Sequence, residues 1–132
     1  MLSKAAVLAQ LSDVPKFKIG AILVHKKTIL SQGFNKRKTH PLQYQYNQLR
    51  ESNKRNRSFI HAEMDCLIGM NRFREIPKNS ILFIGRTNTL GDSLMCRPCE
   101  GCMQYIIDLG ISEIVYNTPN GYAVEKINTR HI

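Results

Sequence analysis

The stretch Phe17-Lys18-Ile19-Gly20-Ala21-Ile22-Leu23-Val24 decides the expected fold. It is a β-rich run with almost no polar side chains, which is typical of a strand covered on both faces. The residues His25-Lys26-Lys27 follow as a turn, and residues 28–34 return as a second strand. Residues 17–34 therefore predict a β-hairpin.

Helical patterns lie on both sides of this hairpin. Apolar residues recur at helical spacing over residues 2–12, and a second amphipathic pattern runs from Ser58, a good N-cap, to about Phe73. A third helix is expected to carry Pro98 in its first turn and to stop at Gly110. Further strands are expected at residues 80–84 and 111–116, and a turn at 119–121 leads to a short strand or helix through 127.

Strands that alternate with helices after an opening hairpin indicate an α/β layered fold with a mixed sheet. The chain has 132 residues and is 42% hydrophobic. A chain of this size can bury one core and is too small for two. Residues 1–132 are therefore expected to form a single domain.

Targeting signals are absent from the sequence pattern. No apolar run approaches the ~18–20 residues of a membrane span. The first eleven residues lack the charged region, apolar region and cleavage site of a secretory signal. We therefore expect a cytoplasmic protein, in which the four cysteines are thiols or metal ligands rather than disulfides.

Positive charge is concentrated in one segment. The net charge is +9, and residues 36–58 hold seven Lys and Arg against one acid, Glu51, which gives +6. A concentrated positive field attracts anionic partners. Taken alone, this segment is most simply a solubilising loop, but its position directly before an expected ligand helix suits a phosphate-attracting rim. Its length favours a functional, mobile or partly helical segment.

Two short motifs carry the chemistry: His61-Ala62-Glu63 and Pro98-Cys99-Glu100-Gly101-Cys102. One imidazole and two thiolates suit a tetrahedral Zn²⁺ that keeps its fourth position open for water, as in catalytic sites. Both motifs are expected at helix N-termini, whose partial positive charge favours thiolates. The carboxylate of Glu63 is placed to move protons. We therefore predict a hydrolytic zinc enzyme with Glu63 as its catalytic acid and base.

Other uses of these residue types remain open. A Cys-x-x-Cys pair alone also occurs in redox sites and structural zinc fingers. Cys96 would close the site if it supplied a fourth ligand, although it lies before the expected helix. Cys66 is expected to be a core thiol. Three further histidines have no partner at ligand spacing and are interpreted as surface or structural residues: His25, His40 and His131.

The pattern H-x-E…P-C-x-x-C is the signature of zinc-dependent nucleobase deaminases. On these motifs the chain resembles the cytidine and deoxycytidylate deaminase superfamily over most of its length. The strand at 18–24, the stretch Gly33-Phe34-Asn35 and residues 106–116 match as well. The stretches KTHP, FIHAE and CRPCEGC are similar to small deaminase-like proteins of phages and other microbes.

This resemblance implies a three-layer α/β/α fold with a mixed, about five-stranded sheet, and zinc as the cofactor. It implies three zinc ligands, His61, Cys99 and Cys102, with Glu63 as the proton shuttle. Asn35 would contact the substrate through its amide, and the backbone of Ala62 would meet the polar edge of the base. One departure is Asp65, because related deoxycytidylate deaminases often carry Asn at that position.

We expect hydrolytic deamination of a cytosine-type nucleotide, dCMP or a relative, to the uracil product and ammonia, by a homo-oligomer. The alternative is a nucleic-acid base deaminase that acts on single-stranded DNA or RNA, including tRNA adenosine. It would bind through residues 36–58, where Tyr44 and Tyr46 offer stacking surfaces. Ordinary packing of those tyrosines is the simpler interpretation. A non-catalytic zinc module is a third possibility, which Glu63 disfavours.

Overall fold

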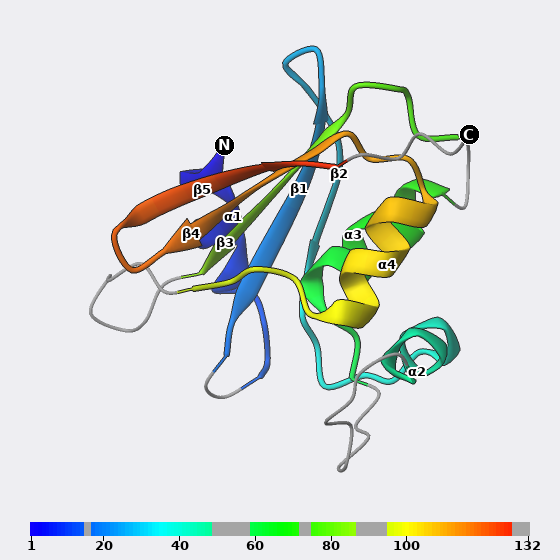
Figure 1. Ribbon diagram of the computed structural model, residues 1–132. Helices are drawn as coiled ribbons and strands as arrows, with labels where there is room; N and C mark the ends of the chain where they lie inside the picture. Colours follow the sequence, from blue (N-terminus) through cyan, green and yellow to red (C-terminus); the bar gives the residue numbers. More distant parts are fainter. Residues whose placement is uncertain (15–16, 49–58, 72–74, 87–94, 128–132) are drawn as a thin grey trace.

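The computed structural model describes residues 1–14, 17–48, 59–71, 75–86 and 95–127 (Figure 1). These residues build one mixed sheet with helices on both faces. The elements follow in the order α1 (Leu2–Ala9), β1 (Ile19–His25), β2 (Thr28–Phe34), α2 (Pro41–Asn47), α3 (Ala62–Asn71), β3 (Ile81–Arg86), α4 (Glu100–Asp108), β4 (Glu113–Thr118) and β5 (Gly121–Lys126).

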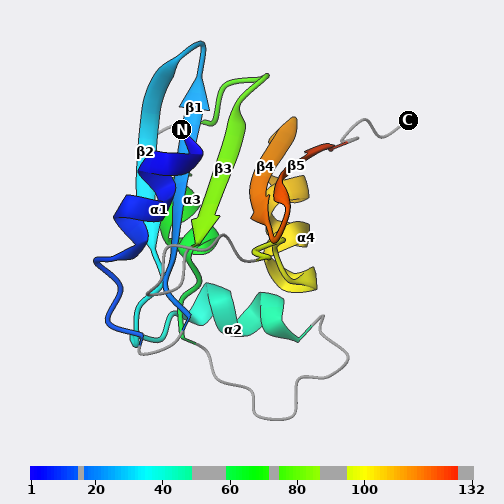
Figure 2. The same ribbon diagram turned by 90° about the vertical axis from the view of Figure 1, so that its left-hand side faces the viewer.

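The five strands lie in the order β2-β1-β3-β4-β5. Strands β3 and β4 run parallel, and the other neighbouring pairs run antiparallel. The parallel pair needs a crossover, which α4 supplies. Helix α1 covers one face of the sheet, while α3 and α4 cover the other (Figures 1 and 2). The structure thus confirms the three-layer α/β/α class and the mixed sheet.

Strand β1 is covered on both faces, as predicted. Ala21 and Leu23 point into the larger core beneath α3 and α4. Ile22 and Val24 point into the smaller core beneath α1. The strand begins at Ile19, so the first two residues of the predicted run lie outside it.

Helix α1 rests directly on the sheet because two glycines face it. Gly20 and Gly85 are register partners on β1 and β3. A Cβ on Gly20 would lie 2.1 Å from the carbonyl oxygen of Ala5, and one on Gly85 would lie 2.7 Å from the backbone nitrogen of Ala6. The helix ends at Ala9, three residues before the predicted end, and the backbone continues in turns.

Two predicted helix starts differ from the structure. Helix α3 begins at Ala62, and the predicted cap Ser58 and predicted end Phe73 lie outside the described residues. Helix α4 begins at Glu100 with Cys99 as its N-cap, so the placement of Pro98 in the first turn is wrong. The extended backbone of Cys99, with ψ 171°, keeps the proline before the helix. Gly110, at φ 78°, ends the helix as predicted.

The remaining elements refine the prediction. The polar segment at 36–58 is partly helical, since α2 occupies Pro41–Asn47. Strand β4 begins two residues after the predicted start, and residues 121–126 form a strand rather than a helix. Helix α4 buries Tyr105 and Ile106, whereas Met103 and Ile107 are half-buried. Among the described helices, none has the length and apolar character needed to span a membrane.

The contact between β2 and α3 predicts a sensitive position at Gly33. A Cβ there would lie 2.4 Å from the backbone nitrogen of Cys66 and 2.8 Å from its Cα. Because backbone must move to admit a methyl group, Gly33→Ala should lower the free energy of unfolding by about 2 kcal/mol or more. Urea denaturation of the purified variant measures this loss.

Gly69→Ala is the matched control within α3. Its added Cβ would approach no atom closer than Ser31 Oγ, at 3.5 Å. Alanine favours a helix interior over glycine, so this variant should be as stable as the original or up to about 1 kcal/mol more stable. Equal stability of the two variants would contradict the close packing of α3 on β2.

Candidate metal centre and active site

The structure brings His61, Cys99 and Cys102 together. His61 directly precedes α3, Cys99 caps α4, and Cys102 lies in the first turn of α4. The Nδ1 atom of His61 lies 3.2 Å from the Sγ atom of Cys102 and 3.7 Å from that of Cys99. Ligand atoms bound at 2.0–2.3 Å to one tetrahedral ion stand roughly 3.5 Å apart. The three side chains therefore fit a single zinc ion.

The pKa values of the two thiols shift in opposite directions. A hydrogen bond from the Cys102 thiol, helped by His61, outweighs burial and lowers the pKa of Cys99 to about 3. The same hydrogen bond, together with burial, raises the pKa of Cys102 well above its usual value. A divalent cation takes the place of such a proton when thiol ligands deprotonate. The pair is thus chemically suited to a metal.

Glu63 lies beside these ligands in the first turn of α3. Its side chain is 4% exposed, and burial raises the pKa of its carboxyl group, while His61 lowers it. Within the described residues, Oε1 of Glu63 is the one buried side-chain oxygen or nitrogen that lacks a hydrogen-bond partner. An unsatisfied buried oxygen is costly and is typical of a functional position.

The two predicted substrate contacts occupy different surroundings. Ala62 is fully buried at the start of α3, between the imidazole and the carboxylate. Asn35 follows β2, where its Oδ1 accepts a hydrogen bond from Ile19 N at 2.9 Å and its Nδ2 donates to Phe17 O. Asn35 therefore ties the start of β1 to the end of β2. A substrate contact by either residue stays a prediction.

The other cysteines lie apart from the metal-ligand group. Among the residues described, that group has three members, and Cys96 is not one of them. Its thiol instead donates to Ile84 O at 3.2 Å, and burial raises its pKa to about 12. Cys66 is a fully buried core thiol, as predicted. The described ligand group thus keeps the three-residue composition of an open site.

The histidines outside the motif have ordinary surroundings where they are described. His40 caps α2, because its Nδ1 accepts a hydrogen bond from Leu42 N at 3.0 Å. His25 ends β1 at the hairpin turn. His131 lies outside the described residues.

Sequence reasoning missed two buried amides beside the ligands. Gln43 and Asn47 lie one turn apart on α2, and both side chains are fully buried. Gln43 Oε1 accepts a hydrogen bond from the backbone nitrogen of His61 at 3.0 Å. In a segment rich in Asn, Gln, Lys and Arg, nothing marks these two as buried. The His40-Pro41 pair, a cap followed by proline at the helix start, was the available signal for α2.

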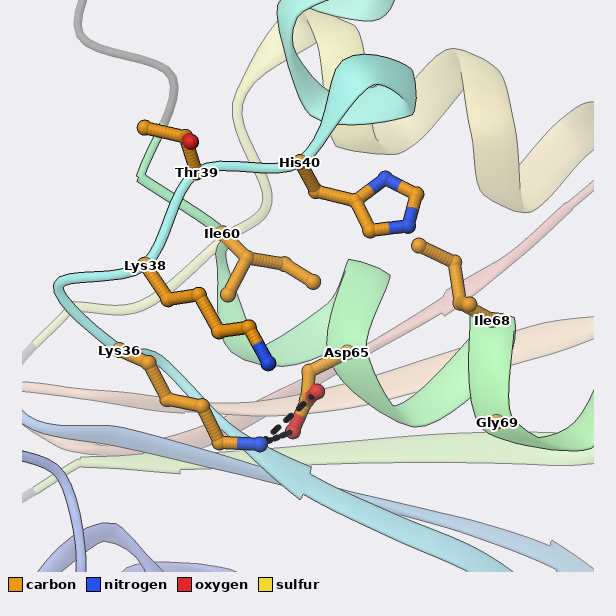
Figure 3. Close-up of a pocket in the computed structure, with 8 residues that line it drawn as sticks. All are labelled: Lys36, Lys38, Thr39, His40, Ile60, Asp65, Ile68 and Gly69. Carbon is orange, nitrogen blue, oxygen red and sulfur yellow. Dashed lines mark hydrogen bonds and ion pairs between the residues drawn. The ribbon is translucent and has the colours of Figure 1, made fainter.

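Asp65 connects α3 to the end of β2. Its carboxylate accepts hydrogen bonds from Phe34 N at 3.1 Å and from Lys36 Nζ at 2.9 Å. Figure 3 shows this ion pair at a cavity of about 210 Å³ between α3 and residues 36–40. The ligand triad does not line this cavity. Related deaminases often carry Asn at this position, and here Asp65 holds α3 against the end of β2.

The cytidine and deoxycytidylate deaminase zinc-binding region matches residues 1–118 of the chain. The chain belongs to this family. The membership confirms the resemblance and, with the His/Cys/Cys group, the prediction of a zinc hydrolase that deaminates a cytosine-type nucleotide. It does not favour the alternative of a nucleic-acid base deaminase.

Solved structures support the fold of this deaminase. The chain is similar to the crystal structure of dCMP deaminase from the cyanophage S-TIM5 in apo form, with 24% identity, a TM-score of 0.58, and coverage of 87% of this chain and 77% of that chain. The complex of the same cyanophage enzyme with dCMP and dUMP gives 24% identity, a TM-score of 0.59, and coverage of 87% and 76%. No curated protein matches the chain significantly.

The basic segment of the deaminase is described in part. Tyr46 packs against Tyr105 with ring centroids 5.1 Å apart, and its hydroxyl donates to Asp108 at 2.6 Å. Packing is therefore the role of Tyr46, whereas Tyr44 is about half exposed. Residues 49–58 lie outside the described residues. Binding of single-stranded nucleic acid and assembly into a homo-oligomer both stay predictions.

The geometry of Cys96 generates a test of the ligand set. Cys96→Ala should keep one zinc per chain, because the thiol of Cys96 donates a hydrogen bond to Ile84 O and is not one of the three proposed ligands. Cys102→Ala removes one of the three donors and should lose most of the metal. Atomic absorption of the dialysed variants measures zinc content. Loss of zinc from Cys96→Ala to the same degree would show that this thiol closes the site.

Proposed function

We propose that the protein is a zinc-dependent deaminase that converts dCMP to dUMP, with His61 Nδ1, Cys99 Sγ and Cys102 Sγ as the zinc ligands. The observation that carries this proposal is the buried, unpartnered Oε1 of Glu63 beside a donor set that fits one ion. The family's zinc-binding region and the chemistry of one nitrogen and two sulfur donors both support zinc.

Hydrolytic deamination forms a C–O bond from water at the amine-bearing carbon of the base and breaks the C–N bond, so no oxidant or reductant is needed. When bound, zinc lowers the pKa of water and supplies a nucleophile at neutral pH. Glu63 takes a proton from the attacking water at Oε1. It delivers that proton to a ring nitrogen. It then takes the second proton of the former water from the new hydroxyl group and gives it to the amine, which leaves as ammonia as the carbonyl forms.

The surroundings of Glu63 suit this proton transfer. Burial raises the pKa of its carboxyl group above the usual value, which makes the carboxylate a better base and brings its proton exchange closer to neutral pH. Because Oε1 has no protein partner in the described structure, it is available to a proton on water or on the base. General acid–base catalysis of this kind contributes about 10²–10⁴ in rate.

Substrate choice rests on charge and on the family. The cyanophage relative was crystallised with dCMP and dUMP, which are related to each other as the substrate and the product of deamination. A net charge of +9 favours capture of a nucleotide carrying phosphate over an uncharged nucleoside. The Nδ2 atom of Asn35 donates one hydrogen to Phe17 O, and we propose that its second hydrogen binds the sugar or base. We propose that the backbone of Ala62, the residue before Glu63, contacts the polar edge of the base.

Turnover of dCMP by zinc-loaded protein tests this function. Ammonia and dUMP should form in equal amounts, and Glu63→Gln should lower kcat by about 10²–10⁴ because the proton carrier is lost. Zinc content should stay at one per chain, since Glu63 is not a ligand. Glu75→Gln, the same change at an exposed position, is the control and should leave kcat unchanged.

Two outcomes would contradict the proposal. Full turnover by Glu63→Gln would remove Glu63 from the mechanism. The protein could instead deaminate a base in an oligonucleotide and release no ammonia from any free cytosine nucleotide or nucleoside. That result would support the nucleic-acid alternative.

A further inference from the structure

Helix α2 carries a buried polar pair that faces the metal centre. Gln43 and Asn47 are both 0% exposed, although each side chain has an amide group. Burying an amide is unfavourable unless its donors and acceptors are satisfied. The contacts of Gln43 therefore show what the burial achieves.

Each polar atom of Gln43 has a partner. Oε1 accepts a hydrogen bond from His61 N at 3.0 Å. Nε2 donates to Asn47 Oδ1 at 2.8 Å and makes a longer contact to Cys102 Sγ at 3.9 Å. Because the backbone nitrogen of His61 can only donate, the oxygen of the amide must face it, and the NH₂ group faces the sulfur. One side chain thus contacts two predicted zinc ligands.

Those two ligands come from different elements. His61 precedes α3 and Cys102 lies in α4, 41 residues apart in sequence. Gln43 spans them from a third element, α2, which lies below α3 and α4 in Figure 2. Its contact with His61 satisfies a backbone N–H at the start of α3, where helices leave such groups unpaired.

Helix α2 is itself held firmly against α4. A Cβ on Gly101 would lie 2.6 Å from the carbonyl oxygen of Tyr46, so the two helix backbones touch at this glycine. The ring of Tyr46 packs on Tyr105, and its hydroxyl bonds to Asp108. The amide of Gln43 is therefore presented from a rigid support.

We propose that Gln43 is a positioning residue of the metal centre, which holds His61 and Cys102 at the separation that one ion requires. The inference rests on the proposed zinc function. Through Oε1 it fixes the backbone that carries the imidazole, and through Nε2 it directs a donor at the thiolate sulfur. Asn47 holds the Gln43 amide in the orientation in which it contacts both His61 and Cys102. Outer residues of this kind commonly contribute 10–100-fold to metal affinity.

Zinc affinity measured by competition with a chelator tests this proposal. Gln43→Met keeps the length of the side chain and removes both hydrogen bonds. Gln43→Glu keeps an acceptor for His61 N and replaces the donor near Cys102 by a carboxylate oxygen. Both variants should bind zinc about 10–100-fold more weakly. The matched controls are Gln45→Met and Gln45→Glu, the same changes at an exposed position of α2, which should keep the original affinity.

A purely structural role predicts a different result. If Gln43 merely fills the core, thermal stability of the zinc-free protein falls while the affinity of the folded protein for zinc is unchanged, which would overturn the proposal. The absorption spectrum of the cobalt-substituted protein gives a second readout, because displaced ligands alter its ligand-field bands. If Gln43→Met does not fold, Gln43→Glu decides, and an unaltered affinity and spectrum in that variant overturns the proposal.

The proposed function fails separately from this inference. If the original protein binds no zinc or leaves dCMP unchanged, the function itself is wrong. If the original protein binds zinc and deaminates dCMP, and the Gln43 variants match it in zinc affinity, only the positioning role is wrong. At saturating zinc, KM of the Gln43 variants should stay within about twofold, because the polar atoms of this amide bond to protein and not to substrate.

Discussion

The approach of His61 Nδ1 to the sulfurs of Cys99 and Cys102 is the constraint on which the rest of the structure depends. Two helix N-termini must meet for these atoms to come within 3.2 and 3.7 Å of each other. The partial positive charge of each terminus opposes that meeting, and the anionic sulfur of Cys99, whose pKa is lowered, relieves it. A proposed metal ligand, Cys99, therefore also makes the junction of α3 and α4 electrostatically favourable.

Close backbone contacts place the two termini. Helix α3 rests on β2 at Gly33, and α2 rests on α4 at Gly101, each at a distance that leaves no room for a Cβ. Such contacts cannot slide without a clash, whereas contacts between flexible side chains can adjust. The close contacts at Gly33 and Gly101 thus fix the helices that carry the proposed metal ligands, although neither glycine takes part in the proposed chemistry.

Features that depend on interactions between residues close in sequence could be predicted, and features that depend on distant residues could not. The hairpin at β1 and β2, the three-layer class and the ligand motifs depend on periodicity and residue type, so they were predictable. The start of α4 was placed wrongly, because proline is tolerated both inside the first turn and before the cap. The burial of Gln43 could not be foreseen, because its partners lie on α3 and α4, and local composition resembles that of a solvated loop. The role of Asp65 depends likewise on a contact with the distant Phe34 N.

Two buried polar side chains flank the ligand set and differ in one respect. Gln43 has every polar atom occupied by protein, which fixes its orientation and makes it a rigid support. Glu63 leaves Oε1 without a protein partner, which costs stability and keeps that atom available. If Gln43 had an unpaired polar atom and Glu63 had every polar atom paired, the proposed ligands would lose their support and the proposed proton carrier would not be available. In this chain, the proposed roles of rigid support and proton transfer thus fall to different buried groups, Gln43 on α2 and Glu63 on α3.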